Sequence, residues 1–499
     1  MIEFGEYLPD VAPLENKGLL NCENILPASS GYRPFPGPSQ ISSNTIDARP
    51  QGAYSARGQA NTSTIYTFIG NATKLYSFAG STFTDVSIAA GYTTGADETW
   101  EFVSWGYDVI ATNFTDVIQN VTLGAPPFAN LAGTPPKARH IAVVDNFLVV
   151  GNTWDAADLF QPQRVRWAGI GTSTSWTVSA TTQADFQDLK NDFGYIQKVV
   201  GGEFGLIFQE RGITRMSYVG SPLVFQFDLV ESNRGALAAN SVVKVGDNVA
   251  YLASDGFFVF DGQQSIPIGD GKVDETFFNS VDIGNLDRMS VALYPNENII
   301  CWSYPSINAT GAIPDTILLY NYSPGSKQRW AFASVDNYII FNPISTAYTL
   351  DGLDAVSTNL DALPEPPPND ISLDSKYWQG SLNMLGMIDT SLGLSAFNSA
   401  PLNATIETGE AWLQEPSRAF ISLIRPHIDK CSGTVTAQIA ARNLESENIS
   451  YGSACSVNSA GFIPVRANGR FMRAQFNLTG SFTDAQGFDI ISTTPVGRN

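Results

Sequence analysis

The sequence predicts an all-β protein with a β-propeller-like domain of about six irregular blades, a C-terminal β-sandwich and an extended N-terminal arm. Three observations predict this fold. The composition, with 43 Gly, 30 Phe and 18 Tyr against six Met, favours strands and tight turns. A unit of short strands separated by glycine-marked turns recurs along the chain. The length of 499 residues supplies material for roughly two to four domains.

The repeated unit is clearest at residues 66–86, where Gly70 and Gly80 separate three short strands. Residues 240–269 form the most regular copy, in which three turns leave four strands in one meander. Its turns include Gly246 and Gly262. We identify the other copies at 100–113, 139–171, 194–220 and 289–335, with turns at Gly106 and Asp145-Asn146 among them. The units recur about every 40 to 60 residues, close to the period of propeller blades, and radial stacking buries both faces of each sheet. Two ordinary β-sandwiches also fit short strands at this spacing.

The strand pattern predicts four segments. They are an extended arm at 1–50, a propeller-like domain at 51–350, a connector at 351–400 and a sandwich at 401–499. The connector is rich in Pro, Asp and Leu, and its prolines exclude a regular helix or central strand (Pro364, Pro366, Pro367 and Pro368). Its spaced leucines indicate an arm laid across another surface (Leu353, Leu360, Leu363 and Leu373), whereas a flexible linker is the alternative.

The last hundred residues resume alternating strands and concentrate arginines. Five or more strands with alternating apolar positions predict a β-sandwich. Arg425 and Arg442 come first, followed by Arg466, Arg470 and Arg473 close together. Fork-shaped pairing with the acidic surface of a neighbouring subunit is one interpretation of the last three, and solvated surface charge is the other. The candidate inter-subunit contacts are therefore Arg466, Arg470, Arg473, Leu353, Leu360 and Leu363.

The charge balance argues against tight binding of nucleic acid. The chain has 48 acidic and 28 basic side chains, a formal net charge of −20, which repels polyanions. DNA is able to pass such a surface without being held, and solubility alone is the other reason for an acidic balance. Residues that would face DNA are not identified by the sequence.

Cysteine usage and the first residues bear on the compartment. Cys22, Cys301, Cys431 and Cys455 are scattered, without a Cys-x-x-Cys pair, as expected of free thiols in a reducing cytosol. The opening MIEFGEYLPD carries acids and no basic segment followed by an apolar one, so we expect no signal peptide. No run approaches the about 20 apolar residues of a membrane span. We therefore expect neither general export nor a membrane anchor.

The motifs of catalysis and cofactor binding are sparse. With only His140 and His427, a histidine metal site or Ser-His-Asp triad has little to draw on, and His140, at the start of an apolar strand, is interpreted as structural. Gly271-Lys272 lacks the upstream glycine of a phosphate-binding loop. Paired carboxylates for glycoside hydrolysis leave no spacing to detect, so an enzyme remains an alternative. We expect no enzyme activity, cofactor or metal.

Several segments resemble one virus family. The opening LPDVAPLENKGLLNCENILPASSGYRPFPGP, at 8–38, is similar to the start of tail-nozzle and packaged-DNA-stabilisation proteins of short-tailed phages (podoviruses). Residues 206–243 and 249–273 resemble that family's central blades. Three later segments resemble the late region of that family: LDSKYWQGS, NATIETGEAWL and GRFMRAQFNLTGSFTDAQGFDI. The resemblance covers nearly the whole chain, although no single motif in it is as specific as a metal-ligand signature.

The resemblance implies a structural virion protein without catalytic function. Such a protein forms a homo-oligomeric ring of six copies below the portal and the tail adaptor, extends and closes the channel for double-stranded DNA, and docks fibres or spikes. It retains the packaged genome, lets it pass at ejection, and is assembled in the host cytoplasm. A ring of this kind needs heterologous interfaces, for which the arm and the connector are candidate suppliers. No insertion for a long distal needle is evident.

Two other function classes stay open. One is a carbohydrate-active or carbohydrate-binding propeller of a phage tail, to which aromatic side chains would contribute by stacking on sugars, although the nine Trp are dispersed as in blade packing. The other is a soluble propeller scaffold for cellular partners. A depolymerisation assay distinguishes the first, and the oligomeric mass bears on the second.

Overall fold

The computed structural model describes residues 1–57, 65–294, 297–343, 384–415 and 417–496. In these ranges strands dominate, and the one α-helix is α1 (Asp274–Ser280). Asp274 and Glu275 in its first turn match the positive end of the helix dipole. The Asp10 carboxylate accepts hydrogen bonds from the backbone N–H groups of Glu275 and Thr276, at 2.9 and 2.8 Å, so the N-terminal segment caps this helix. Short 3-10 turns cover Ala239–Ser241, Ile283–Arg288 and Thr310–Ala312.

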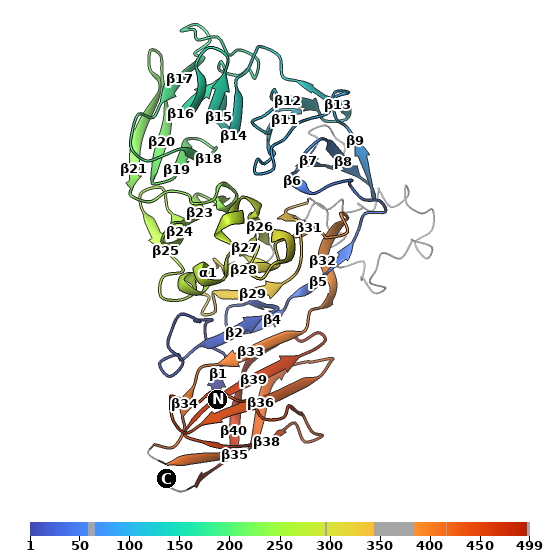
Figure 1. Ribbon diagram of the computed structural model, residues 1–499, viewed down its shortest axis with the longest axis vertical. Coiled ribbons are helices and arrows are strands. Elements are labelled where there is room, and N and C mark those ends of the chain that lie inside the picture. Colours follow the sequence, from blue (N-terminus) through green and yellow to red (C-terminus); the bar gives the residue numbers. More distant parts are fainter. Residues whose placement is uncertain (58–64, 295–296, 344–383, 416, 497–499) are drawn as a thin grey trace.

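Seven antiparallel four-stranded units follow one another in the described ranges, and Figure 1 shows them around a common axis. Each unit runs from its innermost to its outermost strand. Blade 1 is β6 (Pro50–Arg57), β7 (Ile65–Asn71), β8 (Leu75–Ala79) and β9 (Thr82–Asp85). Blade 2 is β10 (Glu101–Trp105), β11 (Asp108–Thr112), β12 (Gln119–Thr122) and β13 (Ala125–Asn130). Blade 3 is β14 (Lys137–Val144), β15 (Phe147–Asp155), β16 (Leu159–Trp167) and β17 (Asp185–Asp188).

The next three blades complete the series that the sequence predicts. Blade 4 is β18 (Ile196–Val200), β19 (Gly205–Gln209), β20 (Gly212–Gly220) and β21 (Val224–Ser232). Blade 5 is β22 (Val243–Val245), β23 (Asn248–Ala253), β24 (Gly256–Phe260) and β25 (Ser265–Pro267). Blade 6 is β26 (Ser290–Tyr294), β27 (Ile299–Tyr304), β28 (Thr316–Asn321) and β29 (Trp330–Ser334). The structure therefore confirms the propeller-like series of meanders.

Blade 7 is assembled from three distant parts of the chain and closes the propeller. Its strands are β30 (Ile339–Phe341), β31 (Gly386–Ile388), β32 (Leu394–Pro401) and, outermost, β5 (Pro36–Gln40). The innermost strands β30 and β6 contact each other, so the last blade meets the first. Three of these strands lie in segments that the sequence analysis assigned to the arm and the connector, and this adds one blade to the expected six.

The hydrophobic cores of the propeller lie between neighbouring blades. Phe68 of blade 1 and Val109 of blade 2 belong to one hydrophobic cluster, and Ile110 of blade 2 and Ile141 of blade 3 belong to another. Tryptophan side chains also form hydrogen bonds across these interfaces. The indole Nε1 of Trp302 in blade 6 donates to the Ser241 carbonyl before blade 5, at 2.9 Å. Each blade thus buries its faces against its neighbours, the reason for which such units occur in sets.

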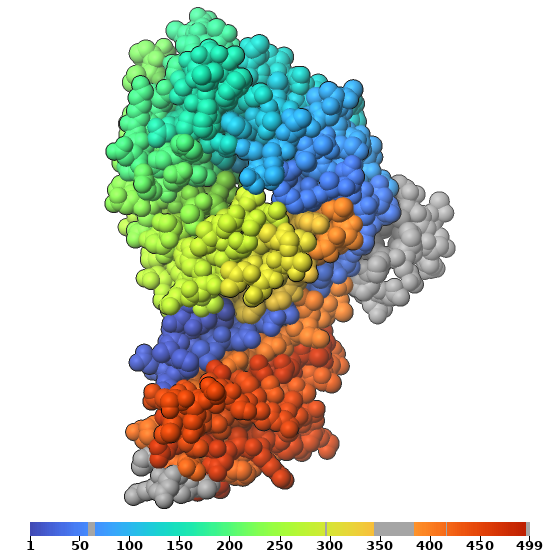
Figure 2. Space-filling model, in the orientation of Figure 1, coloured from blue at the N-terminus to red at the C-terminus, as the bar shows by residue number. Residues whose placement is uncertain are grey.

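The C-terminal region is a two-sheet sandwich joined to blade 6 through one continuous sheet (Figure 1). Figure 2 shows N-terminal residues, in blue, between the propeller and the sandwich. Strand β29 pairs in parallel with β2 (Leu19–Glu23), and the ten-stranded sheet continues through β33 (Ala404–Thr408), β39 (Phe471–Leu478), β36 (Val435–Arg442) and β37 (Cys455–Ser456), with β34 (Ala411–Trp412) on β39. The facing sheet holds β3 (Ile25–Pro27), β4 (Tyr32–Pro34), β40 (Asp484–Val496), β35 (Arg418–Asp429) and β38 (Ile463–Gly469), with β1 (Ile2–Glu3) on β40.

The predicted arm at 1–50 is extended, as expected, and its strands pair within the sheets of both lobes. Strands β1 to β4 belong to the sandwich sheets, and β5 belongs to blade 7. Of the predicted connector, residues 384–400 carry β31 and most of β32. Leu353, Leu360 and Leu363 lie outside the described residues.

Candidate axial site and interaction surfaces

Three ionisable side chains meet at the propeller axis, each from the innermost strand of a different blade. Glu101 opens β10, His140 lies in β14 and Lys198 lies in β18. The Oε1 atom of Glu101 is 2.9 Å from Nδ1 of His140 and 2.8 Å from Nζ of Lys198. Glu101 and His140 are buried, at 6% and 4% exposure. The radial arrangement thus places residues far apart in the sequence in one polar cluster.

The cluster keeps Glu101 ionised inside the protein. Burial on its own raises the pKa of this carboxyl, but Lys198 and His140 outweigh the burial and lower it to about 2. The other carboxylate oxygen, Oε2, accepts the backbone N–H of Ile141 at 3.2 Å. Both oxygens therefore have partners, and the arrangement holds three blades together at the axis.

Two cavities lie beside this cluster. One of about 500 Å³ is lined by His140, Tyr195 and Asp287 among others, and one of about 250 Å³ by Glu101 and Lys198 among others. At the larger cavity the Arg139 guanidinium donates to both carboxylate oxygens of Glu98, with Nη2–Oε1 at 2.6 Å. Its Cζ also lies 4.0 Å from the centre of the Phe114 ring. This arginine is neutralised within its own chain.

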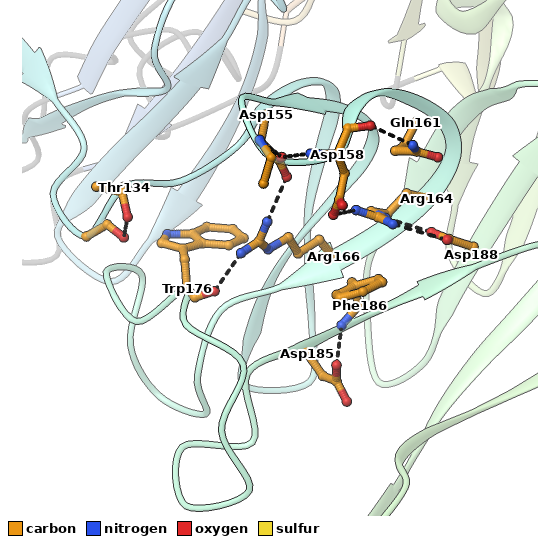
Figure 3. Close-up of polar contacts among 12 residues, drawn as sticks. Thr134, Asp155, Asp158, Gln161, Arg164, Arg166, Trp176, Asp185, Phe186 and Asp188 are labelled. Carbon is orange, nitrogen blue, oxygen red and sulfur yellow. Dashed lines mark hydrogen bonds and ion pairs between the residues drawn. The ribbon is translucent and has the colours of Figure 1, made fainter.

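Blade 3 repeats this internal neutralisation at its outer edge (Figure 3). Arg164 pairs with Asp158 at 2.5 Å and with Asp188 at 2.6 Å, and its side chain is only 6% exposed. Arg166 donates to Asp155 at 3.1 Å and to the carbonyl of Trp176 at 2.8 Å. Neither guanidinium is presented for phosphate binding.

The three predicted arginines of the sandwich lie in different surroundings. Arg466 is exposed on β38, the edge strand of its sheet. Arg470 is half-buried in the turn between β38 and β39, where its backbone N–H donates to the Arg442 carbonyl at 3.0 Å. Arg473 pairs with Glu407 of its own chain at 2.9 Å and is 16% exposed. Of the three, Arg466 is the one whose side chain is presented at the surface.

Sequence reasoning missed the axial cluster. It placed His140 at the start of an apolar strand, whereas the structure has it in the middle of β14 (Lys137–Val144), and it did not connect His140 with Glu101 or Lys198. The available signal was a charged residue at an inward position of an otherwise apolar strand, as in EFVSW at β10 and IQKVV at β18. The pairing across blades depends on radial packing, which no local pattern encodes.

Within the described ranges, no group of three or more His, Cys, Asp or Glu side chains could hold a metal ion. No helix of the described residues is long and apolar enough to cross a membrane. All four cysteines fall in these ranges as free thiols, with Cys22 and Cys301 buried and the other two half-buried.

The comparisons with known proteins found structural similarity only. No protein-family model matches the chain, and no curated protein matches it. Among solved structures, BBS1N in complex with ARL6DN, soaked with mercury, has a TM-score of 0.40 at 10% identity, covering 75% of this chain and 96% of that chain. The Neurospora crassa Pan2 WD40 domain has a TM-score of 0.39 at 7% identity, covering 72% of this chain and 94% of that chain. The fold assignment rests on the strand pairing described above.

Proposed function

We propose that the protein is a structural subunit of a short-tailed phage virion, located at the tail nozzle. In this role its copies form a ring below the portal and adaptor, with six copies as the family resemblance implies, and double-stranded DNA passes through the centre of the ring. The sequence resemblance at 8–38 and 206–273 supports the proposal. The ring is homo-oligomeric, and fibres or spikes are its further partners.

The observation that carries the proposal is the ten-stranded sheet that runs from blade 6 into the sandwich. Strand β2 lies between β29 and β33 in this sheet, so the two lobes share backbone hydrogen bonds across their boundary. A subunit built this way is elongated and has no flexible linker between its lobes at this sheet (Figure 1). Such a subunit would give the proposed ring stiffness, because bending between its lobes would break backbone hydrogen bonds of the shared sheet.

Charge supports passage of DNA rather than its binding. The chain carries a net charge of −20, and described arginines such as Arg139, Arg164 and Arg166 are paired with carboxylates of the same chain. Tight DNA binding requires unpaired cations that release phosphate counterions. A duplex inside the proposed ring would therefore move along an acidic wall that does not retain it.

Deletion of the gene from the phage genome that carries it tests the proposal. Particles that lack the protein are expected to lose packaged DNA and infectivity, and supply of the wild-type chain in trans is expected to restore both. Electron microscopy of complemented particles should place the protein in a ring on the tail axis. Mutant particles that keep their genomes and infect normally would contradict the proposal.

A further inference from the structure

A hydrophobic pocket enters the sandwich between its two sheets. It has a volume of about 310 Å³, at the lower end of the about 300–1,000 Å³ typical of ligand pockets, which suits a few aliphatic side chains. Its floor is apolar and buried, with Ile421 and Phe488 from one sheet and Ile439 and Met472 from the other. The pocket is distinct from the axial cavities, which lie in the propeller.

The rim of the pocket exposes apolar side chains. Leu14 is 37% exposed, Trp412 is 38% exposed and Ile2 is 36% exposed, and all three line the pocket. Large side chains of this kind around one opening present an apolar surface to a partner. Glu410 at the pocket is paired within the chain, since it lies 2.5 Å from Arg442 and its side chain is 2% exposed.

The rim is preformed by backbone contacts between two loops. The N–H of Glu410 donates to the Pro13 carbonyl at 2.8 Å, and the N–H of Gly409 donates to the Gly18 carbonyl at 3.2 Å. A Cβ at Gly409 would lie 2.0 Å from the Asn16 carbonyl oxygen, so the loops are in close contact. A pocket held open in this way does not need to reorganise when it binds.

The chain itself contains a segment with suitable apolar anchors. Pro343 and Met384, which flank residues 344–383, lie next to each other, because the N–H of Met384 donates to the Pro343 carbonyl at 3.1 Å. Their sequence has spaced leucines, Leu353, Leu360 and Leu363 among them. With both ends at one place, a segment of this length reaches out to about 65 Å at full extension.

The point of departure and the pocket lie on different parts of the molecule. Figure 1 draws blade 7, with β31 and β32, on the right of the propeller, and draws the N-terminus and β34 of the pocket toward the lower left. In the proposed ring, the pocket of a neighbouring copy is open to this segment. A surface of one kind that meets a different surface on the next copy is what a heterologous ring requires.

We propose that the sandwich pocket receives leucine side chains from residues 344–383 of a neighbouring copy of the chain. This inference rests on the proposed function, because the contact closes a ring of subunits. It gives the candidate contacts Leu353, Leu360 and Leu363 a binding site, formed by the apolar floor and the rim of Leu14 and Trp412.

Peptide binding to the full-length chain tests the contact. The receptor is the variant Leu353→Ser/Leu360→Ser/Leu363→Ser, whose own segment no longer supplies these anchors, and the probe is a fluorescein-labelled peptide of residues 350–376. Fluorescence anisotropy is expected to show binding that Leu14→Ser or Trp412→Ser in the receptor weakens about tenfold or more, the effect of losing one buried aliphatic contact. Leu223→Ser, at a 72% exposed leucine of blade 4, is the matched control and should leave binding unchanged.

The outcomes separate this inference from the proposed function. A peptide that does not bind, or that binds equally well to the Leu14→Ser and Trp412→Ser receptors, overturns the pocket contact while the gene-deletion result stands. A wild-type chain that blocks the peptide but sediments as a monomer at every concentration shows that the segment fills its own pocket, which overturns the contact between copies. Concentration-dependent association of the wild-type chain, lost in the triple-serine variant, supports it.

Discussion

Glu101 carries a negative charge in a place where burial by itself favours the neutral acid. Lys198 and His140 reverse that preference and lower its pKa to about 2, from an ordinary value of 4.5. A difference of this size between folded and unfolded protein is linked to about 3 kcal/mol of stability. Because the pKa is lower in the folded state, this stability is complete above about pH 5 and is lost as the pH falls toward 2.

Replacement of Glu101 by Gln removes this linkage and leaves Lys198 without its carboxylate partner. We expect Glu101→Gln to lower the free energy of unfolding at pH 7 by about 3 kcal/mol or more, as for a broken buried ion pair. The gap between wild type and variant should narrow by about 2 kcal/mol between pH 7 and pH 3. Urea unfolding at both pH values measures it. Glu203→Gln, at an exposed position, should keep the wild-type pH dependence, and a constant gap for Glu101→Gln would contradict the assigned pKa.

For single residues, the sequence predicted backbone conformation at several turns, but it did not predict which side chains meet across blades. Gly80, Gly106 and Gly246 occupy predicted turns with φ of +64°, +60° and +61°, conformations that favour glycine. Gly70, predicted to separate two strands, instead lies inside β7. Its role comes from a contact with another blade, which the local sequence does not contain.

Elements of the propeller are held together by side chains that cross between blades, and Trp100 is the clearest example. Its ring is 3% exposed, and its Nε1 donates to the Asn71 carbonyl of blade 1 at 2.9 Å. A Cβ built at Gly70 would lie 2.3 Å from Trp100 Cδ1. The absence of a side chain at Gly70 therefore allows the indole to pack directly on the β7 backbone.

This contact predicts a large effect for a small substitution. Gly70→Ala is expected to destabilise the protein by about 1–3 kcal/mol, because the new methyl group displaces Trp100 from a close-packed interface. Gly284→Ala is the control, since the nearest atom to its Cβ is Asp282 Oδ1 at 3.4 Å. Thermal unfolding should show a lower melting temperature for Gly70→Ala than for Gly284→Ala. Equal melting temperatures would mean that the blade interface tolerates the methyl group.

The blades differ in how readily the sequence indicates them. Blades 1 to 6 are each built mainly from consecutive hairpins, so strand alternation and turn residues predicted them. Blade 7 takes β5 from near the N-terminus and separates β30 from β31 by residues 342–385. Its pairing is non-local, and neither periodicity nor turn chemistry reports which distant strands meet. The sandwich strands were predicted, but their continuity with blade 6 depends on β2 in the same way.

The whole molecule is organised around the N-terminal segment, which contributes to both lobes. Strand β2 joins blade 6 to the sandwich, and Leu19 and Cys22 within it are fully buried. The largest hydrophobic core contains Trp302 of the propeller together with Phe476 of the sandwich. A core and a sheet that both cross the boundary make separate unfolding of the lobes costly.

We therefore expect the propeller and the sandwich to unfold in a single transition. Ile406→Ala, at a fully buried position of β33, should cost about 2–5 kcal/mol and lower the unfolding midpoint of both lobes equally. Fluorescence of the buried tryptophans reports the propeller, and hydrogen exchange of β36 and β39 reports the sandwich. Leu75→Ala in blade 1 is the matched core change on the other side and should also move both probes together. If Ile406→Ala shifts only the sandwich probe, the shared sheet does not couple the lobes, and the stiffness on which the proposed ring depends loses its physical basis.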